Sequence, residues 1–203
     1  VIAGLAGPGD QIFIDADCHA SIYDACKLAG AEIVRFAHND PASLDRRLGR
    51  TDPAASNKLV IVEGLYSMFG DIAPIAEFVE VKRRHNAYLA VDEAHSFGVY
   101  GARGLGVAEA AGVLDACDVL IGTFSKSLAG IGGFAVSNHP DFELLRVASR
   151  AYMFTASSSA ASVEATRAAL RCIVIRPELR DRLRENSARL HAGLTAAGFK
   201  LFA

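Results

Sequence analysis

Apolar, β-branched runs alternate with amphipathic segments over most of the chain. The apolar runs predict strands, at 12–16, 32–36, 58–63, 88–92, 119–123 and 133–137. The segments between them predict helices, at 20–28, 42–48, 74–85, 106–111 and 141–148. This alternation is typical of an α/β fold, in which a mainly parallel sheet is flanked by helices on both faces. Ligands bind such sheets beyond the carboxyl ends of the strands, so polar residues that directly follow a strand are the candidates for chemistry.

The pattern changes near residue 157. Two long helices are predicted at 157–175 and 177–197, the second with a proline at its first position and a glycine after its end. The segment 199–201 then predicts the first strand of a further domain. We therefore expect a large domain over 1–172, whose N-terminal part is missing, and over 173–203 a helix and the start of a small C-terminal domain. Because there is no initiator Met, we expect a piece of a longer polypeptide.

Composition and charge exclude several classes of protein. Of the 203 residues 51% are apolar, and 21 basic residues nearly balance 23 acidic ones, whereas disordered chains combine low hydrophobicity with high net charge. The near-neutral balance argues against a nucleic-acid partner. No apolar stretch approaches the ~20 residues of a transmembrane helix, and the first residues do not form a signal peptide. The four cysteines form no CxxC pair or metal-ligand cluster, so we expect reduced thiols in a cytoplasmic protein.

Two polar segments after neighbouring predicted strands carry the strongest chemical signal. One strand ends in Asp92, with His95 just beyond it, and the next strand is followed by Lys126. Each segment has an ordinary interpretation, since Asp92 could cap a turn beside a surface Glu93, and Lys126 could be an exposed lysine. Together they would bring a carboxylate, an imidazole, two hydroxyls and an amine to one crevice. Pyridoxal phosphate requires this set, because a neutral lysine forms a Schiff base with its aldehyde and an acid binds its ring nitrogen.

Competing chemistries lack their motifs. A Ser–His–Asp hydrolase would carry G-x-S-x-G at its nucleophile, and the chain has no such motif. The glycines at 4–9 and 101–106 have the wrong order for a dinucleotide-binding G-x-G-x-x-G, so we interpret both segments as turns.

Two further polar segments follow predicted strands, at 17–21 and 63–71. In the first, His19 could be a residue at a helix N-terminus or a ring that stacks on a planar cofactor. The remaining histidines lie in polar stretches and need no function: His38, His85, His139 and His191.

Four motifs in order resemble those of the α-oxoamine synthases. They are D-x-x-x-H-A-S-x-x-D at 15–24, E-G-L-Y-S-M-x-G-D at 63–71, V-D-E-A-H-S-x-G-x-x-G-x-x-G-x-G at 91–106 and G-T-F-S-K at 122–126. These enzymes belong to the aspartate aminotransferase superfamily, whose members have the fold-type I architecture and bind pyridoxal phosphate. The resemblance extends over nearly the whole chain and implies that residues 1–172 are the cofactor-binding large domain.

The resemblance also implies roles for residues around the cofactor ring. Lys126 would bind the cofactor aldehyde and Asp92 the pyridine nitrogen, while His95 would contact the phenolic oxygen. His19 would stack on the ring, and Ser67 would approach the ring and its substituents.

The phosphate contacts implied by the resemblance come from hydroxyl groups. Thr123 and Ser125 would bind the phosphate within the subunit, and Thr155 would reach it across the interface of a homodimer with shared active sites. The chain departs from the family where Ser158 and Ser159 replace a Pro-Pro pair. The glycine-containing phosphate loop expected before residue 1 and the carboxyl-terminal arginine that grips the amino acid carboxylate are also absent.

The implied reaction is the condensation of an L-amino acid with an acyl-CoA, which releases CO₂ and CoA and gives an α-amino ketone. The string G-T-F-S-K-S at 122–127 favours the branch that uses serine and a long-chain acyl-CoA in sphingolipid biosynthesis; glycine and alanine are the other candidate amino acids. The alternatives are the branches that make aminoketobutyrate, amino-oxononanoate or aminolevulinate, another fold-type I activity such as an aminotransferase or aldolase, and a non-catalytic partner subunit.

Overall fold

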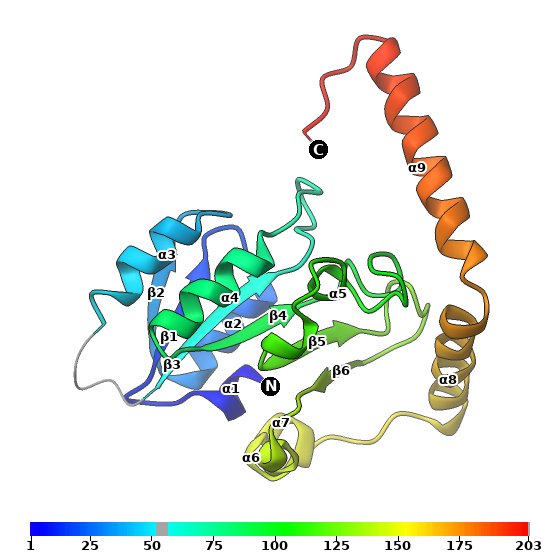
Figure 1. Ribbon diagram of the computed structural model, residues 1–203. Helices are drawn as coiled ribbons and strands as arrows, with labels where there is room; N and C mark the ends of the chain where they lie inside the picture. The colour runs from blue at the N-terminus through cyan, green and yellow to red at the C-terminus, as the bar shows by residue number, and fades with distance from the viewer. Residues whose placement is uncertain (52–56, 203) are drawn as a thin grey trace.

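The computed structural model describes residues 1–51 and 57–202, and a six-stranded sheet of order β2-β1-β3-β4-β5-β6 forms its centre (Figure 1). The strands are β1 (Gln11–Asp15), β2 (Glu32–Phe36), β3 (Lys58–Glu63), β4 (Tyr88–Asp92), β5 (Val119–Thr123) and β6 (Gly133–Val136). Neighbours among β1–β5 pair in parallel, and β6 is antiparallel to β5. The predicted α/β fold with a mainly parallel sheet is therefore confirmed, and the strand bounds differ from the predicted ones by one residue at most.

Helices cover both faces of the sheet. They are α1 (Ile2–Leu5), α2 (Ala20–Ala29), α3 (Pro41–Leu48), α4 (Ile75–Arg84), α5 (Val107–Ala110), α6 (Leu145–Ala148), α7 (Arg150–Met153), α8 (Ala160–Ile175) and α9 (Glu178–Ala196), with 3₁₀ turns η1 (Leu114–Ala116) and η2 (Pro140–Leu144). The chain leaves β1 toward β2 and then crosses back to β3. Because such crossovers are right-handed, α2 lies on one face, where it packs on α1, and α3 lies on the other face with α4.

Local signals in the sequence set the helix ends. The Asp40 side chain accepts a hydrogen bond from the Ser43 amide at 2.9 Å, which caps α3, and Pro41 occupies its first turn. Gly30 ends α2 in the left-handed conformation, with φ of 71°. The predicted helix at 141–148 is wrong in its first half, because the chain forms η2 after Pro140 and becomes α-helical only in α6.

The core lies in the centre of the sheet. Every residue of β1 is buried, as are the central residues of β3 and β4, which explains why these strands appear in the sequence as continuous apolar runs. Helix α4 adds Phe78, whose ring meets Phe36 of β2 edge-on with centroids 5.7 Å apart. This rigid centre fixes the carboxyl ends of the strands relative to one another.

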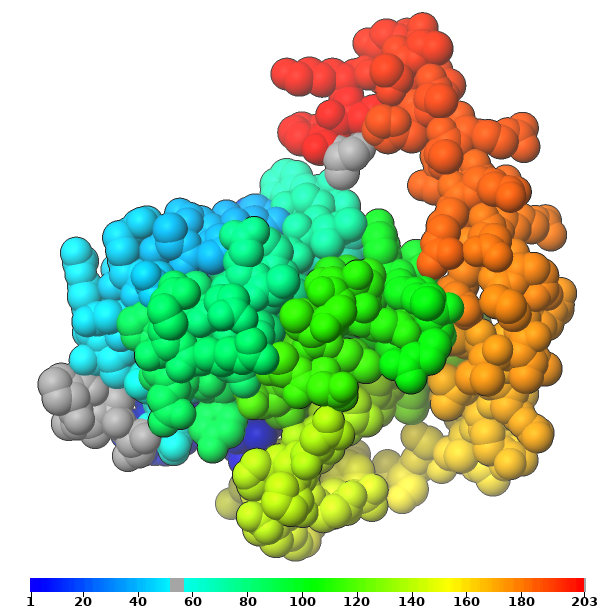
Figure 2. All heavy atoms as spheres, viewed as in Figure 1, coloured from blue at the N-terminus to red at the C-terminus, as the bar shows by residue number. Residues whose placement is uncertain are grey.

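Helices α8 and α9 lie beside the sheet domain, and α9 projects beyond it (Figures 1 and 2). Their side chains are mostly exposed, but Arg180 is 6% exposed and donates to the carbonyls of Ile173 and Ala102 at 2.6 and 2.9 Å. Among the described residues the segment at 199–201 pairs with no strand, so its assignment to a strand of a further domain stays a prediction. In the described part of the chain, no helix has both the length and the hydropathy that a bilayer crossing requires.

Candidate active site

The sequence-predicted residues gather where the carboxyl ends of β1, β3, β4 and β5 meet. Glu63 at the end of β3 is in register with Asp92 at the end of β4, and Asp92 is in register with Ile121 of β5. The direction of the strand order reverses between β1 and β3. The connection from β1 leads to β2 on one side, whereas the connection from β3 leads to β4 on the other side. Parallel sheets bind ligands outside the strands at such a reversal, so the topology alone marks this edge as the candidate site.

Asp92 occupies a half-buried position at the end of β4. Its Oδ1 accepts a hydrogen bond from the Ala94 amide at 2.8 Å. Burial raises the pKa of Asp92, while this hydrogen bond and the charges of Lys126 and His19 act to lower it. The carboxyl group is thus poised to pair with a cationic nitrogen, which would replace the hydration that it has lost.

Lys126 follows β5 in a short turn, where its carbonyl accepts from the Ala129 amide at 3.0 Å. Its side chain is exposed. Partial desolvation lowers the pKa of the Lys126 amine, and the carboxylates of Asp92 and Glu63 oppose that shift. Glu63 and Asp92 end the neighbouring strands β3 and β4, and Lys126 follows β5. The structure therefore brings these residues to one edge of the sheet, as the sequence predicted for Asp92 and Lys126.

Two histidines border the same cluster. His95 is half-buried, and its pKa is lowered first by burial and then by the charges of Lys126 and His19. His19 is exposed at the N-terminus of α2, where its Nδ1 accepts from the Ser21 amide at 3.2 Å. The interpretation of His19 as a residue at a helix N-terminus is therefore confirmed, and its stacking on a cofactor ring stays a prediction.

Glu63 is a member of the cluster to which the sequence reasoning assigned no role. It is 3% exposed, and one carboxylate oxygen accepts a hydrogen bond from the His19 amide. The pKa of Glu63 is raised to about 7, and burial is the largest cause of this shift. The charges of Asp92 and Asp15 raise the pKa further, whereas the hydrogen bond from the His19 amide and the charge of Lys126 lower it. Its position at the end of a buried strand was the available signal, but a strand-terminal Glu in a sequence resembles any surface residue.

Glu93 lies in the interior, so its interpretation as a surface residue is wrong. It is 1% exposed, and its carboxylate accepts from the Ser96 hydroxyl and from the amides of Val107 and Ala108 at 2.9 and 2.8 Å. A Cβ atom at Gly64 or Gly106 would overlap this carboxylate, which explains the glycines at both positions. Through these hydrogen bonds Glu93 links the turn that contains His95 with the first residues of α5.

Two hydroxyl groups stand at the end of β5. The Thr123 Oγ1 and Ser125 Oγ lie 2.8 Å apart, and the Thr123 hydroxyl also meets the Gly132 carbonyl at 3.1 Å. The Ser125 amide donates to Thr123 Oγ1 at 3.2 Å. Thr123 is half-buried, whereas Ser125 is exposed and directly precedes Lys126, so the pair is available to an anionic group near that lysine.

Ser67 and Thr155 are the two remaining predicted site residues. Ser67 is exposed in the loop 64–73 that follows β3, and Thr155 is exposed between α7 and α8. Among the described residues, no hydrogen bond joins either side chain to the residues at 92–95 or 123–126. Their roles toward the cofactor and across a dimer interface stay predictions.

An apolar cavity of about 690 Å³ lies next to the site. It is bounded by residues of β5, β6 and α8 and of the turn after β5, among them Phe124, Phe134 and Leu170. None of the predicted site residues lines it. Its apolar lining makes it a packing surface of the sheet edge rather than the place where the charged cluster acts.

The family model for aminotransferases of class I and II matches residues 1–203, and the chain belongs to this family. Serine palmitoyltransferase of Caulobacter vibrioides is 55% identical over 199 residues, which cover 98% of this chain and 49% of the relative. An 8-amino-7-oxononanoate synthase of Geobacter metallireducens is 41% identical over 202 residues, which cover 98% of this chain and 51% of the relative. The resemblance drawn from the four motifs is thereby confirmed.

A solved structure shows the same arrangement of the chain. Serine palmitoyltransferase from S. paucimobilis with a bound PLP–myriocin aldimine superposes with a TM-score of 0.96 at 50% identity, covering 100% of this chain and 52% of that one. The predicted fold-type I architecture is therefore confirmed. The chain spans about half the length of these relatives.

Proposed function

We propose that the protein to which this chain belongs is a pyridoxal phosphate-dependent acyltransferase that condenses serine with a long-chain acyl-CoA, releasing CoA and CO₂. The observation that carries the proposal is that the carboxyl ends of β3, β4 and β5 bring Glu63, Asp92 and Lys126 to one edge of the sheet, beside the reversal between β1 and β3. The likeness to serine palmitoyltransferases selects the substrates, and the retained Lys126, Asp92 and His95 argue against a non-catalytic subunit.

The donor set fits pyridoxal phosphate. Lys126 would bind the aldehyde carbon, Asp92 the pyridine nitrogen and His95 the phenolic oxygen, and His19 would lie against the ring. Thr123 and Ser125 would hold the phosphate with hydroxyl groups that already stand 2.8 Å apart. When bound, the cofactor supplies an electron-withdrawing ring in covalent linkage to the amino acid nitrogen.

The chain's own residues then perform three tasks. Asp92 would hold the pyridine nitrogen and keep it protonated, because a carboxylate in a half-buried position favours a cationic partner. Lys126 would accept the proton from the amino acid Cα, and partial desolvation, which lowers the pKa of its amine, favours the neutral form that this task requires. The neutral form of His95 is favoured by burial and the nearby cations, so it serves as a hydrogen-bonding group rather than a charge.

The test is the release of CoA thiol by the full-length protein from palmitoyl-CoA, with serine, glycine and alanine in parallel. We expect release with serine, its loss in Lys126→Ala, and no effect of Lys27→Ala, which alters an exposed lysine paired with Asp24. No release with any amino acid would refute the acyltransferase function, and exchange of amino groups between keto acids without CoA would indicate an aminotransferase.

A second candidate is 8-amino-7-oxononanoate synthase or another branch of the same family, which the 41% identity to such a synthase supports. Faster turnover with alanine or glycine than with serine would select it. We further propose that the protein is a cytoplasmic homodimer in which Thr155 of one subunit contributes to the site of the other. Equilibrium sedimentation of the full-length protein checks the dimer, and complementation between Thr155→Ala and Lys126→Ala subunits checks the shared site.

A further inference from the structure

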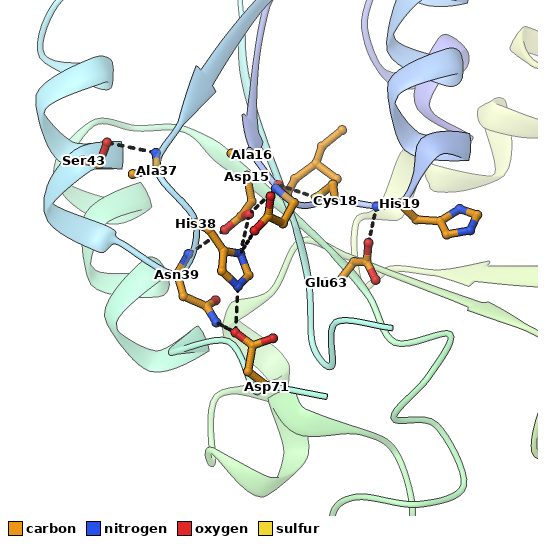
Figure 3. Close-up of polar contacts among 12 residues, drawn as sticks. Asp15, Ala16, Cys18, His19, Ala37, His38, Asn39, Ser43, Glu63 and Asp71 are labelled. Atoms are coloured by element: carbon orange, nitrogen blue, oxygen red, sulfur yellow. Dashed lines mark hydrogen bonds and ion pairs between the residues drawn. The ribbon is translucent and has the colours of Figure 1, made fainter. Parts of the chain in front are cut away.

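His38 lies between two carboxyl groups from distant parts of the chain (Figure 3). Its Nδ1 is 2.8 Å from Asp15 Oδ1 and its Nε2 is 2.7 Å from Asp71 Oδ2. Asn39 donates a hydrogen bond to each of the same two carboxylates. Its backbone amide donates to Asp15 Oδ2 at 2.9 Å, and its side-chain Nδ2 donates to Asp71 Oδ2 at 2.7 Å. In the sequence His38 lies in a polar stretch and was assigned no function, because its partners are distant along the chain.

Both ring nitrogens of His38 face an acceptor. A neutral imidazole has one N–H, so both contacts are hydrogen bonds only when the ring is protonated. Partial burial lowers the pKa of His38, but the hydrogen bonds and charges of Asp15 and Asp71 raise it further, and the net shift is upward. Asp17 Oδ2 lies 3.8 Å from Nδ1, and the buried Tyr66, whose pKa is raised by burial, presents its ring edge-on at 4.4 Å.

These contacts hold the loop 64–73 on both of its sides. The loop is closed on itself by the bridge between Leu65 and Ile72 and by the Tyr66 amide, which donates to the Asp71 carbonyl at 3.0 Å. His38 packs against Tyr66 on one side and bonds Asp71 on the other. The other carboxylate that His38 contacts is that of Asp15, the last residue of β1. Its Oδ1 accepts a hydrogen bond from the Asp17 amide at 2.9 Å and so stabilises the turn that leads from β1 to the site.

Ser67 is the residue of this loop that the family resemblance directs toward the cofactor, and it directly follows Tyr66. The tip beyond it is exposed, with Met68 at 86% and Phe69 at 47%. Apart from the bonds at the base of the loop, the Phe69 ring lies 6.5 Å from the His38 ring and 6.0 Å from the Phe202 ring, between centroids. One oxygen of Asp71 receives both the His38 and the Asn39 bonds, while its buried Oδ1 has no partner among the described residues.

We propose that protonated His38 is a positioning residue, which holds the loop carrying Ser67 in place beside the crevice and releases it when the imidazole loses its proton. The role toward the cofactor rests on the proposed function, whereas the hold on the loop does not. The hold is complete below the ordinary histidine pKa of about 6.5 and is lost as the pH rises through the raised pKa of His38.

The test is hydrogen exchange of the full-length protein with its cofactor, measured from pH 6 to 9 as protection factors for residues 65–73. In the wild type we expect protection to fall roughly tenfold as His38 deprotonates, since one charge-assisted hydrogen bond is lost. In His38→Gln protection should be low and independent of pH. His85→Gln is the matched control, because His85 bonds one carboxylate, Asp45, at 2.7 Å on another part of the surface.

Asp71→Asn provides a second variant should His38→Gln fail to fold, and it should show the same low, pH-independent protection. A merely structural role would lower protection in the variants without any pH dependence in the wild type. The proposal is overturned by wild-type protection that does not change with pH, or by either variant keeping the wild-type pH profile. Because exchange requires no turnover, a protein that releases no CoA would refute the proposed function and leave this result intact.

Discussion

Glu63→Gln is expected to make the protein more stable at alkaline pH. In the folded chain the Glu63 carboxyl group is 3% exposed and burial raises its pKa to about 7, whereas in the unfolded chain it titrates near 4.5. The folded state therefore binds more protons than the unfolded state between these values, and the stability that the protonated group confers is lost as the pH rises. The amide of Gln cannot ionise, and its carbonyl can still accept the hydrogen bond from the His19 amide.

The size of the effect follows from the shift in pKa. A rise from 4.5 to about 7 corresponds to roughly 3 kcal/mol at about 1.4 kcal/mol per unit. We expect the wild type and Glu63→Gln to have similar free energies of unfolding at pH 5, where Glu63 is protonated in the folded state. At pH 8 the variant should be more stable by up to roughly 3 kcal/mol.

The assay is urea denaturation of the cofactor-free full-length protein, followed by circular dichroism at pH 5, 6.5 and 8. Glu80→Gln serves as the control, since Glu80 is an exposed partner of Arg83 and its replacement should change little at any pH. Parallel stability curves for the wild type and Glu63→Gln across this range would refute the argument that a buried, ionised Glu63 destabilises the fold.

Two further predictions concern the packing around Glu93. Glu93→Gln should lower the free energy of unfolding by about 1–3 kcal/mol, because its NH₂ group would face the buried Val107 amide, which now donates to the carboxylate; stability equal to that of Glu80→Gln in the same urea titration would contradict this. Gly106→Ala should cost at least about 2 kcal/mol, since its Cβ would overlap Glu93 at a φ of 109°. Gly112→Ala is the matched comparison, because Gly112 also has a positive φ, of 71°, but has open space around the position of the added Cβ. Thermal melts should show a smaller loss of stability for Gly112→Ala than for Gly106→Ala.

The central strands were predictable because each is buried on both faces and so appears as an unbroken apolar run. The residues that directly follow them could also be identified, since the parallel register brings Asp92 and Lys126 to one edge of the sheet. The short helices α1 and α7 were missed, because each is a single turn without a periodic pattern. The segment at 199–201 has the composition of a strand, but a strand also requires a neighbour with which to pair.

The parts of the site that escaped prediction depend on contacts between distant segments. His38 meets Asp15 and Asp71, which lie 23 and 33 residues away along the chain. Glu93 is buried because amides 14 and 15 residues further on donate to it. A single sequence contains the residues of such networks but no local pattern that joins them, whereas strand-end positions follow from the topology.

The most direct test of the central claim is to identify the lysine that binds the cofactor. The full-length protein is mixed with pyridoxal phosphate, reduced with borohydride to make the linkage permanent, digested, and mapped by mass spectrometry. We expect a pyridoxyl group on Lys126 and its absence in Lys126→Ala. Labelling of another lysine at equal or greater yield, or none at all, would contradict the assignment of this crevice as the cofactor site.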